Sequence, residues 1–326
     1  KPCYQSGAIC RYIPIPRTRF LLEELMKAIT FKTPAKVNLG LNILGKREDG
    51  FHELETLFQM VNWCDEIKLE CLSRGLDLTC NQPEIPTDDE NLVIKAAHLL
   101  QIRYPGRCKG ARINLTKNIP HGAGLGGGSG NAAGVLLGLN FLWNLNLKRK
   151  DLILLASELG SDVPFFLFSP CAIGRSRGEI LEPVKNSIKF YVLMVYPGFP
   201  LSTAWVYGNL KLKLTKQQNN ISILKNFLLQ SEYAQLGASW NNDLEAVVFQ
   251  EYPEVFGIKK EMLALGAKGA LLSGSGSTVF GIFDNLETAK KAYARLEEEK
   301  FKLFLAESII SLSELYPDEM LAALLP

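Results

Sequence analysis

The chain has 326 residues and a formal net charge of +2, so its overall charge does not predict a nucleic-acid or membrane-surface partner. Apolar residues make up 47% of it, which is ample for packed cores, and the length favours two domains. The seven cysteines are scattered, without a Cys-x-x-Cys pair or a Cys/His cluster. This argues against a zinc site and for free thiols in a reducing compartment. No apolar run approaches the ~18 residues of a membrane span.

Residues 1–25 differ in composition from the rest of the chain. They carry three arginines and three prolines, with no acid before Glu23, and Met26 follows as a natural start. The segment lacks serine enrichment and a clear amphipathic period, so we expect an upstream extension or an expression remnant rather than a targeting sequence. A cytoplasmic location is therefore expected. A plastid-type organelle is the alternative if the segment does belong to a targeting sequence.

Residues 31–44 predict a half-buried strand. From Lys36 to Ile43, apolar residues occupy one face of a period-two pattern and polar or small residues the other. From this pattern alone, Lys36 is most simply a solvated strand lysine. Asp49-Gly50 then predicts a turn, after which Phe51 would be a core aromatic and His52 a turn histidine.

Further strands are expected over residues 65–71 and 76–79, followed by a helix over residues 92–104. Asn91 stands at the start of this helix, where asparagine is usually a capping residue.

Residues 119–131 are the most informative stretch of the chain. Six glycines stand between Pro120 and Asn131, a strand-like segment leads in, and an apolar run over residues 132–143 predicts a helix. Glycine lets a backbone approach a ligand closely, and a helix that begins in such a loop directs free N–H groups at it. The sequence therefore predicts an anion site, with phosphate as the favoured anion. We expect a β-branched residue at Gly126 to fill space that a phosphate needs.

Two common phosphate motifs fit this stretch poorly. Residues 122–127 satisfy Gly-x-Gly-x-x-Gly, but a dinucleotide fold also needs an acid at a strand end about 20 residues on. Asp151 is near that spacing, yet it is expected to cap a helix that runs to Leu159. A P-loop needs a lysine after the glycines, and none follows.

The region after this helix places an aspartate at a rigid junction. Gly160 suits a helix end and Pro164 prevents continuation, so Asp162 is fixed between them among apolar neighbours. As a bare pattern this aspartate is a turn former. Residues 174–178 form a basic turn that faces either phosphate or solvent.

A second domain is expected from about residue 185. The pattern predicts strands over residues 189–196 and 301–309 and two strands around a glycine-serine turn over 268–283. Helices are predicted over 221–231, 241–251, 254–265 and 285–300, with a short helix after residue 311. We therefore divide the chain into an extension at 1–25, an N-terminal domain at 26–184 and a C-terminal domain at 185–326.

Several segments together resemble the GHMP kinases. The family's phosphate loop is Pro-x-x-x-Gly-Leu-Gly-Gly-Gly-Ser-Ser-Asn, and residues 120–131 match it except that Gly130 replaces the second serine. Residues 34–39, with 45–59, are similar to the branch of the family that phosphorylates 4-diphosphocytidyl-2-C-methyl-D-erythritol. Residues 160–164 look like the family's Gly-x-Asp-Val-Pro motif, and residues 268–283 like its third motif.

This resemblance implies an α+β fold in two domains. The N-terminal domain would be like the second domain of ribosomal protein S5, and the C-terminal domain would be ferredoxin-like. It implies an ATP-dependent kinase in which Asp162 is the catalytic base and Lys36 stabilises charge. Substrate contacts are implied at Asn38, Phe51, His52, Thr203 and Tyr207, with Phe51 and Tyr207 on either side of the cytosine.

The resemblance also implies contacts with ATP and Mg²⁺. Ser129 is the candidate Mg²⁺ ligand. The implied ATP-binding residues are Asn91, Pro120, His121, Gly122, Ala123, Gly124, Leu125, Gly126, Gly127, Gly128, Ser129 and Gly130.

Two rival functions remain open from the sequence. One is another GHMP kinase acting on homoserine, mevalonate or a sugar, and the other is a non-catalytic nucleotide-binding protein on the same fold. The elements around Lys36 and Phe51 argue against the first, and the presence of both Lys36 and Asp162 argues against the second. We expect a small-molecule substrate, a cytidine diphosphate-linked methylerythritol, and a monomer or weak homodimer, without a nucleic-acid or membrane partner.

Overall fold

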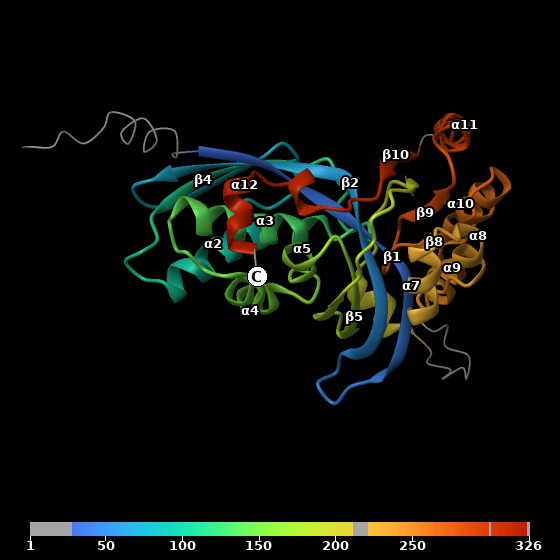
Figure 1. The fold of residues 1–326 in the computed structure, drawn as a ribbon, viewed down its shortest axis with the longest axis horizontal. Coiled ribbons are helices and arrows are strands. Elements are labelled where there is room, and N and C mark those ends of the chain that lie inside the picture. Colours follow the sequence, from blue (N-terminus) through green and yellow to red (C-terminus); the bar gives the residue numbers. More distant parts are fainter. Residues whose placement is uncertain (1–27, 211–220, 300, 325–326) are drawn as a thin grey trace, which may run out of the picture.

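The computed structural model describes residues 28–210, 221–299 and 301–324. The expectation for residues 1–25 lies outside these residues. Within them, two β-sheets lie side by side, each with its own layer of helices (Figure 1). None of the described helices is long and apolar enough to cross a membrane.

The first sheet is organised around the long hairpin of β1 (Ala28–Lys46) and β2 (His52–Leu72). The opposite edge of β2 pairs with two strands, one near each of its ends: β4 (Gly110–Thr116) along residues 66–72 and β5 (Cys171–Ser176) along residues 54–59. The sheet is completed by β3 (Leu76–Cys80) and β6 (Ile180–Pro183). The turn between β1 and β2 projects beyond the body of the molecule at the bottom of Figure 1, with Gly50 at a φ of 84°.

Helices cover one face of this sheet and form the first hydrophobic core. They are α2 (Leu92–Arg103), α3 (Gly127–Leu142), α4 (Arg149–Leu159) and the short α5 (Phe165–Phe168). Two glycines let α3 lie directly on the strands, because a Cβ at Gly134 would be 2.5 Å from Thr33 and one at Gly138 would be 2.5 Å from Leu69. The N-terminus of α3 is thereby held close to β1.

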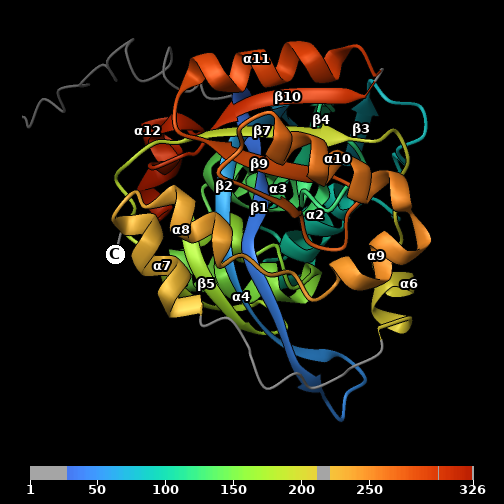
Figure 2. The same ribbon diagram turned by 90° about the vertical axis from the view of Figure 1, so that its right-hand side faces the viewer.

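The second sheet is antiparallel with the order β10-β7-β9-β8, which is the ferredoxin-like arrangement that the resemblance implied. Its strands are β7 (Tyr191–Tyr196), β8 (Gly269–Leu272), β9 (Val279–Phe283) and β10 (Lys302–Glu307). The helices α10 (Pro253–Ala264) and α11 (Leu286–Glu297) pack against one face (Figure 2). The other face packs on β1 and β2, with α7 (Ile221–Leu229) and α8 (Tyr233–Ala238) in the same core. The short helices α6 (Thr203–Gly208) and α9 (Glu245–Glu251) lie before and after α7 and α8 in the chain.

Several predicted element boundaries were wrong. The helix α3 begins at Gly127 rather than near residue 132, because its first turn is built from the glycine loop itself. Asp151 is not the N-cap of α4 but lies in its first turn, where its carboxylate accepts a hydrogen bond from the backbone N–H of Lys148. The helix α8 was not predicted, and α9 begins later than residue 241.

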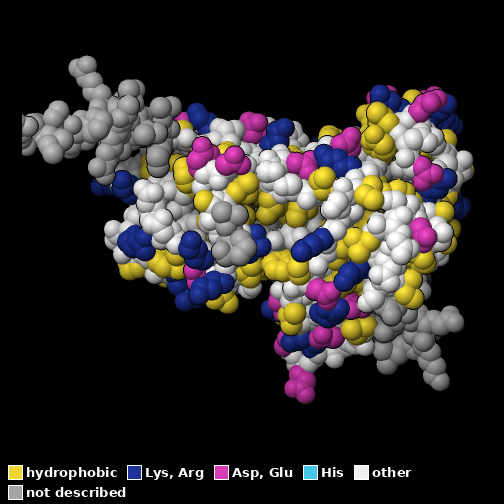
Figure 3. Space-filling model, in the orientation of Figure 1, with side chains coloured by type: hydrophobic (Ala, Val, Ile, Leu, Met, Phe, Trp, Pro, Cys, Tyr) yellow, Lys and Arg dark blue, Asp and Glu magenta, His cyan; other side chains and the backbone are white. Residues whose placement is uncertain are grey.

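The C-terminal tail packs back on the first sheet's core rather than on the second sheet. The ring centroids of Tyr316 and Phe31 are 5.8 Å apart, and Met320 in α12 (Asp318–Leu321) is fully buried in the same core. The division at residue 185 stays a prediction, although β1–β6 all precede it and β7–β10 all follow it. On the face in Figure 3, basic and acidic side chains are interspersed, and no large area carries one sign.

Candidate active site

The glycine loop between β4 and α3 adopts a backbone conformation that residues with side chains could not adopt. Gly122, Gly124 and Gly126 have φ angles of 63°, 76° and 68°, in the left-handed region that favours glycine. A Cβ at Gly124 would also collide with the carbonyl oxygen of Ser273, and one at Gly122 would be 2.5 Å from Pro200. The loop can therefore lie against the segments after β7 and β8 only with glycine at these positions.

The carbonyl oxygens of four consecutive loop residues are bonded to the surrounding protein. Their donors are the backbone N–H of Leu201 to Gly122, of Thr278 to Ala123 and of Lys36 to Leu125, and the hydroxyl of Ser273 to Gly124. With the acceptors so engaged, the groups that the loop and the first turn of α3 can offer to a ligand are N–H donors. The first intrahelical bond is donated by Gly130, so the N–H groups before it in α3 have no helical acceptor. This arrangement suits an anion.

Lys36 and Asp162 meet at the edge of this loop. The Nζ of Lys36 donates a hydrogen bond of 2.7 Å to Oδ1 of Asn38 and lies 3.7 Å from Oδ2 of Asp162. Asn38 is fixed in turn by donating to the hydroxyl of Thr56 at 2.8 Å. The prediction of a solvated lysine from the strand pattern alone was wrong, because the glycine loop and Gly274 cover this face of β1 and leave Lys36 only 4% exposed.

Burial sets the electrostatics of this pair. Desolvation lowers the pKa of Lys36 below its ordinary value, and the charge and hydrogen bonding of Asp162 oppose this without cancelling it. The side chain of Asp162 is 35% exposed, so its carboxylate is open to a substrate while Lys36 lies behind it. Asp162 follows the end of α4 at Gly160 and precedes Pro164, the rigid junction that the sequence indicated.

One cavity of about 1080 Å³ brings together nearly all the predicted site residues. Its lining includes Lys36, Asn38, Phe51, His52, Asn91, Asp162, Thr203, Tyr207 and the loop from Pro120 to Ser129. Gly130 is the exception, because its N–H bonds the carbonyl of Gly126 and its Cα faces Pro34 and Phe166. The structure therefore gives no support to Gly130 as an ATP contact, and a Cβ there would lie 2.9 Å from the carbonyl oxygen of Pro34.

The expectation for Gly126 also needs correction. A Cβ there would lie 3.1 Å from Lys36 and 3.1 Å from Phe166. A valine would disturb the lysine stem rather than fill space for a phosphate. Asn91 is the N-cap of α2, as expected, and its side chain accepts from Val93 and donates to Pro86.

The opposite end of the cavity is aromatic. Phe51 is 54% exposed, and the guanidinium of Arg177 lies 4.9 Å from its ring centroid. The rings of His52 and Tyr207 are 5.2 Å apart and tilted by 39°. Burial and the nearby charge of Lys46 lower the pKa of His52, so its imidazole is neutral at pH 7. Thr203 shares a hydrogen bond of 3.0 Å with Ser275.

The sequence of this chain is similar to those of known proteins. Residues 91–170 match the model of the GHMP kinases N-terminal domain, and residues 229–303 match that of the GHMP kinases C-terminal domain. The chain is 43% identical to a 4-diphosphocytidyl-2-C-methyl-D-erythritol kinase of Chlorobium phaeobacteroides (strain BS1), over 88% of this chain and all of the relative. This chain belongs to the GHMP kinase family. The expected ATP-dependent transfer to an alcohol is thereby confirmed.

Two solved structures extend the comparison. A 4-(cytidine 5'-diphospho)-2C-methyl-D-erythritol kinase matches with a TM-score of 0.76 and 36% identity, over 86% of this chain and 99% of that one. A homoserine kinase from Cytophaga hutchinsonii matches with a TM-score of 0.69 and 23% identity, over 87% and 95% of the two chains, which shows a shared fold. The predicted two-domain GHMP kinase fold is confirmed.

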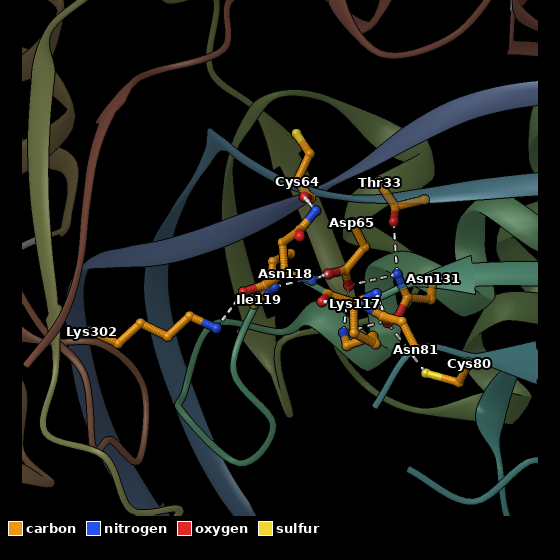
Figure 4. Close-up of polar contacts among 10 residues, drawn as sticks. All are labelled: Thr33, Cys64, Asp65, Cys80, Asn81, Lys117, Asn118, Ile119, Asn131 and Lys302. Carbon is orange, nitrogen blue, oxygen red and sulfur yellow. Dashed lines mark hydrogen bonds and ion pairs between the residues drawn. The ribbon is translucent and has the colours of Figure 1, made fainter. Parts of the chain in front are cut away.

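Beneath the loop of this GHMP kinase lies a buried charged network that sequence reasoning missed (Figure 4). Asp65 of β2 is fully buried and accepts hydrogen bonds from the backbone N–H of Asn118 and Ile119, at 2.7 and 2.9 Å. Its other oxygen accepts from the Nζ of Lys117 and from the side chain of Asn131, at 2.9 Å for the latter. The network therefore ties the entry to the glycine loop to the first turns of α3.

Several residues that line the cavity of this GHMP kinase were not assigned from the sequence. Lys117 and the third-motif residues Gly274 and Ser275 line the cavity beside the loop. The only signal for the network was a pair of charged residues, Asp65 and Lys117, at the ends of strands expected to be half-buried. The side chain of Arg177, in the basic turn that could face either phosphate or solvent, lines the cavity.

Proposed function

We propose that this protein transfers the γ-phosphate of ATP to the 2-hydroxyl of 4-diphosphocytidyl-2-C-methyl-D-erythritol, a step of the non-mevalonate isoprenoid pathway. The observation that carries the proposal is that one cavity holds the Lys36–Asp162 pair, the glycine loop and the Phe51–His52 element. A kinase of such a substrate must bind a triphosphate, a planar base and a hydroxyl at once. The similarity to two kinases named for this substrate supports it further.

Each group has a role that its position supports. Asp162, open to the cavity, accepts the proton of the substrate hydroxyl as that oxygen attacks the γ-phosphorus, and the bond from this phosphorus to the β–γ bridging oxygen breaks to release ADP. Lys36 lies 3.7 Å away and stabilises the negative charge of the ionised carboxylate and of the transferring phosphoryl group. Asn38 holds the Lys36 ammonium in place through their hydrogen bond of 2.7 Å. In phosphoryl transfer, such positioning and charge stabilisation provide most of the catalysis.

The loop and the first turn of α3 bind the phosphates of ATP through backbone N–H groups. Mg²⁺ fits this site as a companion of the nucleotide. The described residues contain no cluster of three metal-ligating side chains, and Mg²⁺ is commonly bound through phosphates and waters with few protein ligands. Ser129, in the first turn of α3 and on the cavity wall, would supply a hydroxyl ligand. The bound ion would neutralise phosphate charge.

Base recognition is proposed for the aromatic end of the cavity. The cytosine stacks on Phe51, and the neutral imidazole of His52 reads its polar edge. A neutral imidazole carries one donor and one acceptor, which matches an edge with an amino group beside a ring nitrogen. Tyr207 packs against His52 at this end, and Thr203 lines the same cavity.

A coupled ADP-release assay tests the proposal directly. The enzyme with ATP and Mg²⁺ should turn over the cytidyl substrate, and turnover with homoserine, mevalonate and simple sugars should be at least 100-fold lower in kcat/KM, the kind of discrimination that buried polar contacts allow. The Asp162→Asn variant is the control for contaminating kinases. A preference for any other substrate would favour another GHMP activity, and nucleotide binding without any turnover would favour a non-catalytic protein.

A further inference from the structure

Arg177 lies between the reactive end and the base end of the cavity. It occupies the turn between β5 and β6, and its guanidinium is 4.9 Å from the centroid of the Phe51 ring. The next residue, Gly178, borders the catalytic carboxylate, since a Cβ there would lie 4.0 Å from Oδ1 of Asp162. Two consecutive residues thus reach from the aromatic platform to the proposed base.

The proposed substrate has its charge in the corresponding place. Its base belongs at Phe51 and its reacting hydroxyl at Asp162, and the diphosphate connects the two ends of the molecule. We propose that Arg177 binds this diphosphate and is a specificity-determining residue for a nucleoside diphosphate-linked substrate. The inference rests on the proposed function and deepens it.

Few cationic side chains of the cavity are available to bind the diphosphate. Its cationic lining side chains are Lys36, Lys46, Lys117 and Arg177. Lys36 is paired with Asp162, and Lys117 is held by Asp65 beneath the glycine loop. Lys46 and Arg177 remain at the aromatic end. The planar guanidinium is the better match for a diphosphate, because it can donate two parallel hydrogen bonds to phosphate oxygens.

The local contacts orient Arg177 without using all its donors. Its ion pair with Glu179 is made by Nε at 3.6 Å, and the carboxylate of Glu179 also accepts from the backbone N–H of Arg177 at 2.8 Å. The two outer nitrogens form no hydrogen bond within the described part of the chain. Asp49 is the other acid near it, and its carboxylate is already engaged by Arg47 and by the N–H of Phe51. The guanidinium is thus stacked and positioned with its outer edge available to a ligand.

The test compares Arg177→Met with Arg177→Lys in the full chain. Arg175→Met is the matched control, because Arg175 lies two residues away but pairs with Glu55 and Glu182 and does not line the cavity. Loss of a charged hydrogen-bonding partner should raise KM for the cytidyl substrate about 10- to 100-fold in Arg177→Met. The KM for ATP should stay within about twofold of the wild-type value, and the melting temperature within a few degrees. Arg177→Lys should recover part of the loss in binding of the cytidyl substrate.

Inhibition by fragments separates diphosphate binding from support of the aromatic ring. CDP and cytidine serve as competitive inhibitors against the cytidyl substrate. In Arg177→Met, the inhibition constant of CDP should rise about 10- to 100-fold while that of cytidine stays near its wild-type value. An equal rise for both would mean that Arg177 acts only by supporting Phe51, and no rise for either would mean that it does not contact substrate. Either result overturns the inference while the wild-type enzyme still phosphorylates the cytidyl substrate, whereas a wild-type enzyme without that activity overturns the proposed function as well.

Discussion

The Nζ of Lys36 lies 3.7 Å from Oδ2 of Asp162, with the lysine side chain 5% exposed and the aspartate side chain 35% exposed. The two partners therefore differ in their access to solvent. The buried partner has a lowered pKa, mainly because desolvation penalises its charge. Asp162 opposes that effect, so removing its charge would also change the protonation of Lys36. The two residues should act as one unit.

Asp162→Asn keeps the shape of the side chain but cannot accept a proton. We expect kcat to fall by roughly 10²–10⁴, with smaller changes in the KM for either substrate. Lys36→Met should also lower kcat strongly, and the double variant should lose less than the product of the two effects. Steady-state kinetics of the three variants provides the check. Near-wild-type turnover by Asp162→Asn would remove it from the mechanism.

The lowered pKa of Lys36 predicts a pH dependence of activity. In the free enzyme, Lys36 should lose its proton at a pH below 10.5, the ordinary pKa of lysine. As the pH is raised, kcat/KM should therefore begin to decline before pH 10.5 is reached. Between the folded and unfolded pKa values, the unfolded chain holds more protons than the folded one. The contribution of this group to the free energy of unfolding therefore rises with pH, and the decline should not be caused by unfolding.

An arginine stays protonated throughout this range and serves as the control. The profile of Lys36→Arg, at whatever lower absolute rate, should lack the alkaline decline. Circular dichroism at each pH would establish that the fold is retained. A wild-type profile that is flat up to pH 10.5 would contradict the assignment.

The sequence predicted where the reactive groups lie along the chain better than what covers them. Period two identified the two faces of β1, but it does not say whether the polar face meets water. At Lys36 and Asn38 that face is covered by the glycine loop and by Gly274, and both contacts are long-range. Lys36 is consequently buried, which the strand pattern alone could not show.

The same reason explains the missed network. Asp65 and Lys117 are distant in sequence, and each has the same parity as the apolar residues of its strand, so the pattern places both on the buried face without pairing them. Only the pairing of β2 with β4 brings them together. Glycine patterning, in contrast, predicts local backbone shape, and the positive φ angles of Gly122 and Gly124 agree with the phosphate-loop interpretation. The six-residue helix α8 was too short to give a periodic signal.

A side chain at Gly128 tests the phosphate site more directly than one at Gly126. Gly128 is exposed on the cavity wall, and a Cβ there would meet only Leu92, at 3.9 Å. Gly128→Val should raise KM for ATP about 10- to 100-fold, as expected when hydrogen bonds to a charged ligand are lost, with little change in melting temperature. Calorimetric titration with ATP measures the same loss.

Two other glycines supply the controls. Gly257→Val places the same side chain in open space in α10, away from the cavity, and should leave ATP affinity unchanged. Gly126→Val should lower the melting temperature, because its φ is 68° and its side chain would meet Lys36 and Phe166. Unchanged ATP affinity in a folded Gly128→Val protein would contradict the phosphate-loop assignment.

Removing Asp65 should destabilise the protein strongly. Asp65→Ala leaves the buried ammonium of Lys117 without its carboxylate and two backbone N–H groups without an acceptor. Breaking one side of a buried ion pair costs about 3–5 kcal/mol, measured here as the free energy of unfolding in denaturant. The double variant Asp65→Leu with Lys117→Met should recover part of this, since no charge is left unpaired. A loss below about 1 kcal/mol in Asp65→Ala would show that water replaces the carboxylate.

Base recognition should depend on Phe51 more than on Tyr207. The family resemblance implied Phe51 and Tyr207 on either side of the cytosine, and this stays a prediction; Tyr207 also packs against His52, with ring centroids 5.2 Å apart. A base between two rings needs about 7 Å, twice the usual contact distance of carbon atoms, so none fits between His52 and Tyr207. One face of Phe51 is next to Arg177, and the base must use its other face. Tyr207 would then act by supporting His52.

Phe51→Ala should raise KM for the cytidyl substrate by about 5- to 150-fold, the equivalent of ~1–3 kcal/mol for loss of base stacking, with KM for ATP nearly unchanged. Phe51→Tyr keeps a ring and should stay near wild type. His52→Ala should narrow the preference for cytidine over uridine analogues, because stacking alone tolerates any base and the polar edge must supply the choice. Tyr207→Phe keeps the ring against His52 and should preserve that preference, whereas Tyr207→Ala should weaken it. If Phe51→Ala weakened ATP binding and spared the cytidyl substrate, the aromatic end of the cavity would belong to the nucleotide, and the proposed orientation of both substrates would have to be reversed.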